Sequence, residues 1–514
     1  MTRLKILSIL LAICCVAACT SNQPEVEVAP AETIETRAPT QEQVQPSATI
    51  VPKATSRLTL EITDTPEKTD SPTDIPVGEP VEISNREVVE TLVLKYNPNE
   101  TNFIYMETSP DVYRLAYTRF TDQGQYVVLG EEKQGPYDEI ELLSFSPDSQ
   151  HIVYVAKLGD KKFVVLDGIE QTYYDDIFTS VIFSPDSQRI AYVAKKDKKL
   201  IAVIDGSEFI YDNIQRGIRL SPDGQRFAFV ARDLNANAFV VLDGNEGKKY
   251  DDIEIYNLDL YFSPDSQHLA YLAKKGDDWF VVLDGEKGFP FRESYPDLVF
   301  SPDSQHFAYH AKIGEQVVII LDGQILDNKF EASYNPVFSP DSQRLAYIAS
   351  LNEERFFVVD GTEDPAYEGF IHGLTFSPNS QRYAYRIETD DKYVMVIDGV
   401  IQEGHNVRSS PVFSPNSQHI AYMTFDGDSY YLVLDGKEIE DYDSISNINF
   451  SPDSNHILFI AQDDDTWIEY IVLDGIGGKK YDDIISPIIF DAEYSFHYIA
   501  ILEDEVYLVE ENIN

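Results

Sequence analysis

The residues of this chain best suited to acid–base or metal chemistry are its nine histidines. Five of them directly follow the same short turn phrase, and other copies of that phrase carry Arg at this position. Because a guanidinium cannot replace an imidazole as a proton shuttle or metal ligand, we expect solvated repeat positions without a catalytic role. The five are His151, His268, His306, His419 and His456, and the corresponding arginines are Arg114, Arg189, Arg226, Arg344 and Arg382.

The other four histidines, His310, His372, His405 and His497, lie in separate copies and lack zinc-site spacing. Clustered carboxylates are the remaining metal-ligating resource, in a Tyr-Asp-Asp-Ile tetrapeptide and its variants. They could bind Ca²⁺, but none has the spaced acidic loop of an EF-hand, and charge on an outer strand also protects a sheet edge. We therefore expect no metal or other cofactor, with Ca²⁺ as the alternative. The copies are Tyr174–Ile177, Tyr211–Ile214, Tyr250–Ile253, Tyr442–Ile445 and Tyr481–Ile484.

Nucleophile motifs are absent from the sequence: no Gly-x-Ser-x-Gly elbow occurs, and we expect no catalytic residue. Aromatic side chains are plentiful, with 32 Tyr and 28 Phe, and most fall on expected strands where they would form the core. A few stand in loops, outside the regular phrase, where they could line one rim and stack on sugar rings or peptide side chains. These candidate rim contacts are Phe289, Phe291, Tyr295, Tyr367 and Phe370.

The elements that position these residues come from a repeat. The phrase Phe-Ser-Pro-Asp-Ser-Gln, or a variant of it, occurs eleven times at steps of 37–42 residues. In the copy that starts at Phe338, the Ser-Pro-Asp-Ser turn leads into an apolar run over 344–349. A second apolar run over 355–359 ends in Asp-Gly, a preferred hairpin turn, and a more acidic fourth segment follows.

Four short antiparallel strands per unit, apolar inside and charged outside, are typical of a β-propeller blade. The sequence therefore predicts an all-β propeller of about eleven four-stranded units over residues 86–514. Eleven blades exceed the usual four to eight, so either one oversized ring or two abutting propellers would account for them. The last unit lacks its fourth strand, and the strand-like run over 88–95 could complete it and close the ring.

The ten residues Phe183–Tyr192, followed one strand later by an apolar pair and Asp-Gly, resemble the WD40-like repeat of TolB-type periplasmic propellers. The resemblance covers roughly residues 86–514 and implies the propeller fold. It implies little about activity, because such propellers serve many functions.

The N-terminus has the pattern of a secretion signal. Arg3 and Lys5 precede an apolar stretch that ends in Val-Ala-Ala-Cys, which resembles a bacterial lipobox with Cys19 as the lipidated residue. We therefore expect a signal peptide over 1–18 and a lipid anchor at Cys19. An ordinary signal cut after Ala18, or an uncleaved anchor, is the alternative. Residues 19–85 are rich in Pro, Thr and Glu, and we expect a disordered tether there.

The formal net charge of −48 repels phosphate backbones and anionic lipid, so nucleic acid is not an expected partner. Together these features favour a non-enzymatic binding scaffold, a lipoprotein on the extracytoplasmic side of a bacterial cell envelope. Its partner would be a protein or an envelope polymer. One alternative is a hydrolase or lyase acting on a polysaccharide or peptide, with acids from several blades. The other is a structural subunit of a TolB-like envelope complex.

Overall fold

The structure is a computed structural model that separates into two compact units, residues 1–76 and residues 77–514. It describes residues 86–95, 105–178, 180–254, 260–292, 296–326, 330–389, 392–463, 466–485, 487–492, 495–503 and 505–513. The expected signal peptide, Cys19 and the tether lie outside the described residues, as does Tyr295.

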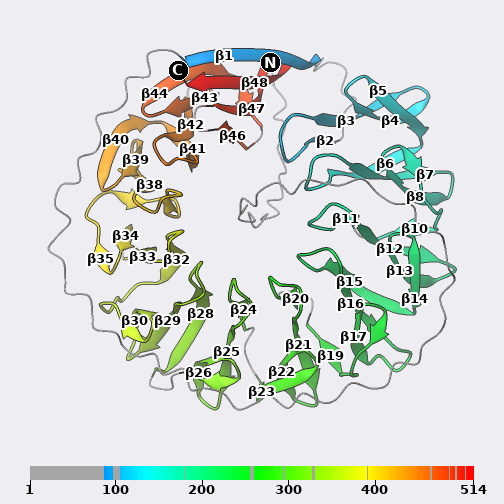
Figure 1. Cartoon of the computed structure of the whole chain (residues 1–514), viewed down its shortest axis with the longest axis horizontal. Helices are drawn as coiled ribbons and strands as arrows, with labels where there is room; N and C mark the ends of the chain where they lie inside the picture. The colour runs from blue at the N-terminus through cyan, green and yellow to red at the C-terminus, as the bar shows by residue number, and fades with distance from the viewer. Residues whose placement is uncertain are drawn as a thin grey trace, which may run out of the picture. The chain divides into compact units, whose positions relative to one another are not determined.

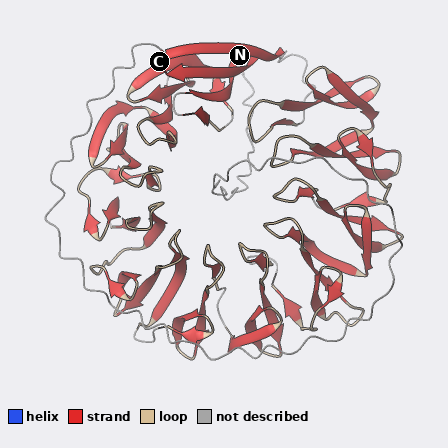
Figure 2. Cartoon of the chain, viewed as in Figure 1, coloured by secondary structure: helices blue, strands red, loops and turns tan. Residues whose placement is uncertain are grey.

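The described part contains strands and loops and no helix (Figure 2), which agrees with the all-β prediction. The strands fall into eleven repeat units, numbered here along the chain. Unit 1 has β2 (Met106–Thr108), β3 (Leu115–Thr121), β4 (Gly124–Leu129) and β5 (Glu132–Tyr137). Unit 2 has β6 (Glu139–Phe145), β7 (Ile152–Leu158), β8 (Lys161–Leu166) and β9 (Ile169–Glu170). Unit 3 has β10 (Asp176–Ile177), β11 (Ile182–Phe183), β12 (Ile190–Lys196), β13 (Lys199–Ile204) and β14 (Ser207–Tyr211). Unit 4 has β15 (Asn213–Leu220), β16 (Phe227–Arg232), β17 (Ala238–Leu242) and β18 (Asn245–Glu246).

The next four units repeat this order. Unit 5 has β19 (Asp252–Ile253), β20 (Tyr261–Phe262), β21 (Leu269–Lys275), β22 (Asp278–Leu283) and β23 (Glu286–Phe291). Unit 6 has β24 (Leu298–Phe300), β25 (Phe307–Ile313), β26 (Gln316–Leu321) and β27 (Gln324–Ile325). Unit 7 has β28 (Ala332–Phe338), β29 (Leu345–Leu351), β30 (Glu354–Val359) and β31 (Thr362–Glu363). Unit 8 has β32 (Ile371–Phe376), β33 (Tyr383–Glu388), β34 (Tyr393–Ile397) and β35 (Val400–Ile401).

The last three units complete the set. Unit 9 has β36 (Asn406–Val407), β37 (Val412–Phe413), β38 (Ile420–Phe425), β39 (Tyr430–Leu434) and β40 (Lys437–Tyr442). Unit 10 has β41 (Ser444–Phe450), β42 (Ile457–Asp463), β43 (Ile468–Leu473) and β44 (Ile476–Tyr481). Unit 11 has β45 (Asp483–Ile484), β46 (Ile489–Ala492), β47 (Ser495–Leu502) and β48 (Glu505–Ile513), and it is completed by β1 (Arg86–Lys95).

Each unit is an antiparallel sheet, and the described strands form ten sheets because a single parallel bridge joins units 6 and 7. Within residues 77–514 the sheets follow one another around a ring (Figure 1). Strands such as β20 and β24 lie on its inner side, and β14 and β23 lie on its outer side. The second strand of a unit is buried on both faces, as Ile152–Ala156 of β7 show, because a sheet packs against each side of it.

The ring closes through the N-terminal strand. Strand β1 pairs antiparallel with β48, so it supplies the strand that unit 11 lacks. Unit 11 also packs against unit 1, because Val112 and Leu115 of unit 1 share a core cluster with Ile499 and Val506. The run over 88–95 is therefore confirmed as the closing strand, and the repeats form one oversized ring rather than two propellers.

Candidate functional site

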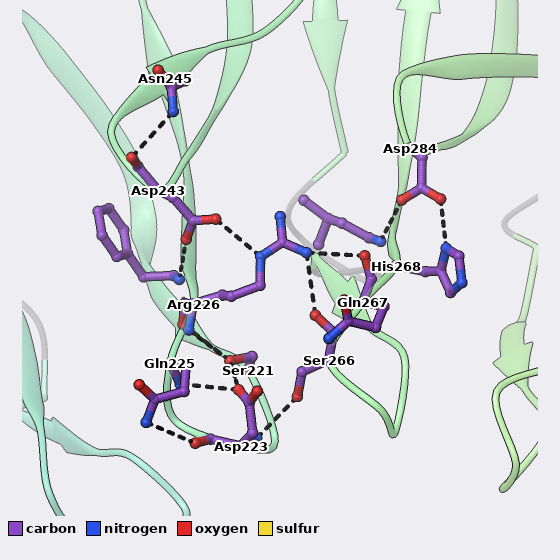
Figure 3. Close-up of polar contacts among 12 residues, drawn as sticks. Ser221, Asp223, Gln225, Arg226, Asp243, Asn245, Ser266, Gln267, His268 and Asp284 are labelled. Atoms are coloured by element: carbon purple, nitrogen blue, oxygen red, sulfur yellow. Dashed lines mark hydrogen bonds and ion pairs between the residues drawn. The ribbon is translucent and has the colours of Figure 1, made fainter. Parts of the chain in front are cut away.

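The repeated turn phrase forms the same set of hydrogen bonds in successive units, and Figure 3 shows the copy in unit 4. The Ser221 hydroxyl donates to Asp223 Oδ1 at 2.6 Å and accepts the backbone N–H of Arg226 at 2.9 Å. The backbone N–H of Asp223 donates to the hydroxyl of Ser266 in the next unit at 3.0 Å. The turn residues therefore build the turn and join neighbouring units, which agrees with their interpretation as turn formers.

In units 2 to 10 the His or Arg after the turn binds the aspartate of the Asp-Gly turn in its own unit, whereas Arg114 of unit 1 donates to two carbonyls of the next turn. Arg226 Nε lies 2.9 Å from Asp243 Oδ2, and its Nη1 donates to two carbonyls of the next turn. His268 Nδ1 lies 2.6 Å from Asp284 Oδ2, in the corresponding place (Figure 3). The expectation of a solvated position was incomplete, because these side chains also tie one turn to another, and it was wrong for His456, which is buried at 5% exposure.

The turn aspartates should make the ring sensitive to acid. Hydrogen bonds, first from the Ser hydroxyl and then from a backbone N–H, hold the pKa of four of them below 3.8: Asp148, Asp223, Asp265 and Asp303. A lowered pKa in the folded state gives stability that is present above the unfolded value of about 3.9 and lost as the pH falls through the folded value. We predict that changing all four to Asn, the residue present at Asn379, flattens the pH dependence of the unfolding free energy below about pH 4. Urea unfolding at a series of pH values measures this, and an unchanged acid dependence would contradict it.

A second repeated feature is an aromatic pair between neighbouring units. The residue that begins each acidic tetrapeptide is Tyr or Phe in nearly every unit, and it packs edge-to-face against an aromatic ring on the second strand of the next unit. Eight such pairs lie in the described part of the chain, with ring centroids 5.1–6.5 Å apart and interplanar angles of 60–82°. They are Tyr137–Tyr154, Tyr174–Tyr192, Tyr211–Phe229, Tyr250–Tyr271, Phe330–Tyr347, Tyr367–Tyr385, Tyr442–Phe459 and Tyr481–Tyr498.

Between units 8 and 9 this pair is missing. The position that should hold the aromatic residue is Gly404, and no aromatic ring of the described residues pairs with Tyr422 across the interface. A pocket of about 400 Å³ lies at this place, lined by Gly404 and Tyr422 and by Met395, Val407, Thr424, Val433 and Glu438 among others. A β-carbon built on Gly404 would meet no atom within 4 Å.

Comparison with unit 3 shows that the pocket occupies the place of the missing ring. The residues of unit 3 and its neighbour that correspond to the apolar lining lie in one filled core cluster, which has Tyr174 at the position of Gly404. They are Val164 for Met395, Ile177 for Val407, Tyr192 for Tyr422, Ala194 for Thr424 and Val203 for Val433. Ligand pockets typically measure about 300–1,000 Å³ and combine an apolar wall with a few polar groups, and this pocket fits that description.

The polar groups of the pocket converge on Glu438. His405 Nδ1 lies 2.9 Å from Glu438 Oε1, and the Thr424 hydroxyl donates to the same oxygen at 3.4 Å. Burial, with the nearby Glu438 charge, raises the pKa of Tyr422 to about 12, so its hydroxyl stays protonated at neutral pH. The pocket thus offers two carboxylates, Glu403 and Glu438, one imidazole and one phenol beside an apolar wall.

A second pocket, of about 420 Å³, lies near Tyr211 between units 3 and 4. Most of its charged lining is paired: Lys199 with Asp212, Arg232 with Asp252, and Lys249 with Asp233. Tyr211 occupies the aromatic position here, and these charged side chains bind one another. This pocket is therefore a weaker candidate for a ligand site than the pocket at Gly404.

Comparisons with known proteins add little to this geometry. No protein-family model matches the chain, and no curated protein matches it. The solved structures similar to it include one described as "Crystal structure of the eukaryotic initiation factor". It is 13% identical, covers 71% of this chain and 98% of its own, and has a TM-score of 0.38. A likeness this weak carries no argument about function.

The candidate rim aromatics are dispersed rather than gathered at one rim. Phe291 and Tyr367 occupy the repeat's aromatic position and are only 2% and 7% exposed, so their side chains belong to the core. Phe289 and Phe370 are 37% and 56% exposed, and Arg355 lies over the Phe370 ring at 4.0 Å. The expectation of a rim contact therefore stays a prediction for Phe289 and Phe370, and Tyr295 lies outside the described residues.

Sequence reasoning missed the pocket residues. The signal was present as an exception: Gly404-His405-Asn406-Val407 stands where other units have Tyr-Asp-Asp-Ile or a relative of it. The described residues include neither a group of three or more His, Cys, Asp or Glu side chains that could hold a metal ion nor a helix long and apolar enough to cross a membrane.

Proposed function

We propose that this protein is a non-enzymatic binding protein whose ring of repeats holds a ligand pocket between units 8 and 9. The observation that carries the proposal is the replacement of the repeat's aromatic residue by Gly404, together with the pocket found there. The repeated polar residues are engaged in turns and in contacts between units, as in Figure 3. A site that differs from the repeat is therefore the best place for recognition.

The proposal includes a location. The lipobox-like Val-Ala-Ala-Cys supports a lipid anchor at Cys19, and the Pro- and Thr-rich residues after it support a tether that holds the ring beside a membrane. The TolB-like repeat supports a role among proteins of the bacterial cell envelope. Mass spectrometry of the N-terminal peptide tests the anchor: a lipid-modified Cys19 is expected, and an unmodified Cys19 would contradict it.

Affinity capture tests the binding function. The full chain, tagged at its C-terminus, would be isolated in detergent from cells that produce it, and retained proteins and glycans would be identified by mass spectrometry. We expect a partner that the unchanged chain retains and that Glu438→Leu loses by about tenfold or more, because Glu438 is the carboxylate that His405 and Thr424 contact in the pocket.

The matched control is Glu246→Leu. Glu246 has the same repeat position in unit 4, two residues after Asp243-Gly244, and it lines the second pocket. Retention should survive this change. A set of retained molecules no different from that on empty resin would show that the proposed function is wrong.

A further inference from the structure

The filled interface before unit 3 shows what the pocket at Gly404 is shaped to hold. There the ring of Tyr174 lies edge-to-face with Tyr192 at 6.1 Å, and the Tyr174 hydroxyl donates to Glu208 at 2.8 Å. In sequence register, Tyr422 corresponds to Tyr192 and Glu438 corresponds to Glu208. The pocket therefore keeps both partners of a tyrosine side chain and lacks the tyrosine itself.

Glu438 has room for a further donor. Its described contacts, from His405 and Thr424, both reach Oε1. No hydrogen bond from a described residue reaches its other oxygen, and the carboxylate side chain is about one-third exposed, at 35%. A hydroxyl that entered the pocket in the manner of Tyr174 would meet an acceptor that the chain itself leaves available.

The pocket has an apolar wall. It is formed by Met395, Val407, Val433 and the ring of Tyr422, which pack in one core cluster. A planar ring packed edge-to-face against Tyr422 would restore the contact that eight other interfaces of the described chain make, and such aromatic pairs stabilise beyond the burial of their area.

The charge of the site indicates whether the ligand's polar group is neutral or anionic. A phenol is neutral at pH 7, because its pKa is about 10. A carboxylate or phosphate at the same place would meet Glu438, and it would approach a chain with a formal net charge of −48. A neutral hydrogen-bond donor on a ring is therefore favoured over an anion.

We propose that the pocket at Gly404 binds a 4-substituted phenol, the chemistry of a tyrosine side chain. The inference rests on the proposed binding function and names its ligand class. The volume of about 400 Å³ exceeds that of one ring, so the substituent opposite the hydroxyl also has space. A tyrosine of a partner polypeptide and a free phenolic compound share this chemistry.

The test compares p-cresol with toluene, which differ only in the hydroxyl, by ligand-observed NMR titration of the full chain. We expect p-cresol to bind about tenfold more tightly or better, as a hydrogen bond to a carboxylate allows. In Glu438→Leu the ratio of the two affinities should collapse toward one, whereas in Glu246→Leu it should be unchanged. Circular dichroism melting of both variants checks that each is folded.

Two results would overturn the inference: equal affinity for p-cresol and toluene in the unchanged chain, or p-cresol affinity that Glu438→Leu leaves intact in a folded variant.

N-acetyl-tyrosinamide distinguishes a tyrosine of a partner polypeptide from a free phenolic compound as the natural ligand. Its binding supports a tyrosine within a polypeptide, and its exclusion while p-cresol binds supports a free phenolic compound. Binding of p-cresol without a captured protein or glycan would leave this inference standing and remove the macromolecular partner from the proposed function. A partner captured through the pocket without p-cresol binding would leave the proposed function standing and remove this inference.

Discussion

Replacing Arg86 by alanine should destabilise the ring by about 3–5 kcal/mol, the cost of leaving a buried charge without its partner. Arg86 lies on the closing strand β1, and its Nε and Nη2 contact the carboxylate of Glu511 on β48. The Glu511 side chain is 0% exposed, and the Tyr498 hydroxyl also donates to it, at 2.7 Å. Without the guanidinium, this carboxylate would remain in the core with a single hydroxyl donor.

Arg86 also joins β1 to the neighbouring unit. Its Nη1 donates to the carbonyls of Ile471 and Ile476 in unit 10, at 3.2 and 3.3 Å, and its guanidinium lies over the Phe496 ring at 5.7 Å. The substitution should therefore also weaken the contacts of β1 with β48 and with unit 10. Urea unfolding measures the total loss, and faster backbone hydrogen exchange in β1 than in β7 would locate it at the closing strand.

The control is Lys95→Ala on the same strand. Lys95 pairs with Glu505 at 2.8 Å, but its side chain is 77% exposed, and exposed ion pairs contribute about 0–1 kcal/mol. A loss for Arg86→Ala as small as that for Lys95→Ala would mean that β1 is not what holds the ring closed.

The fold could be predicted from the sequence because the same strand and turn pattern occurs in eleven copies. A period of 37–42 residues, a proline-containing turn and an Asp-Gly turn specify the same four strands in each unit. Even the closing strand was predictable, since the run over 88–95 was apolar and unattached while unit 11 lacked a strand. The number of rings was not predictable, because contacts between units 1 and 11 join residues nearly 400 positions apart, as Asp111 and His497 do.

The site was harder to predict for a related reason. Sequence reasoning looked for residues that could do chemistry, and a glycine does none. The pocket at Gly404 is defined by a side chain that is absent, and its absence matters only because Tyr422 lies across the interface. Gly404 lies in a bend between β35 and β36 and Tyr422 lies on β38, so only the structure pairs them. The same limit hid the pairing of His268 with Asp284.

Removing the ring from a regular interface should reproduce the pocket. We predict that Tyr174→Ala costs about 3–5 kcal/mol, because Tyr174 is 1% exposed and a large core side chain leaves a cavity that relaxes only in part. Urea unfolding measures the loss. Tyr173→Ala is the matched control: the neighbouring Tyr173 is 41% exposed and stacks on Phe163 at 4.3 Å, so its removal should cost about 1 kcal/mol.

The same variant decides whether a missing tyrosine is enough to make a phenol site. In Tyr174→Ala, p-cresol should recover part of the lost stability in proportion to its concentration, because a ligand that binds only the folded state stabilises it by mass action. Toluene should recover less, since Glu208 keeps an acceptor for the hydroxyl that Tyr174 supplied. Adding Glu208→Leu should remove the advantage of p-cresol over toluene. If Tyr174→Ala gains no p-cresol site although it is folded, an emptied aromatic position does not suffice. The pocket at Gly404 would then depend on His405 and Thr424, the neighbours of Glu438 that the unit 3 interface lacks.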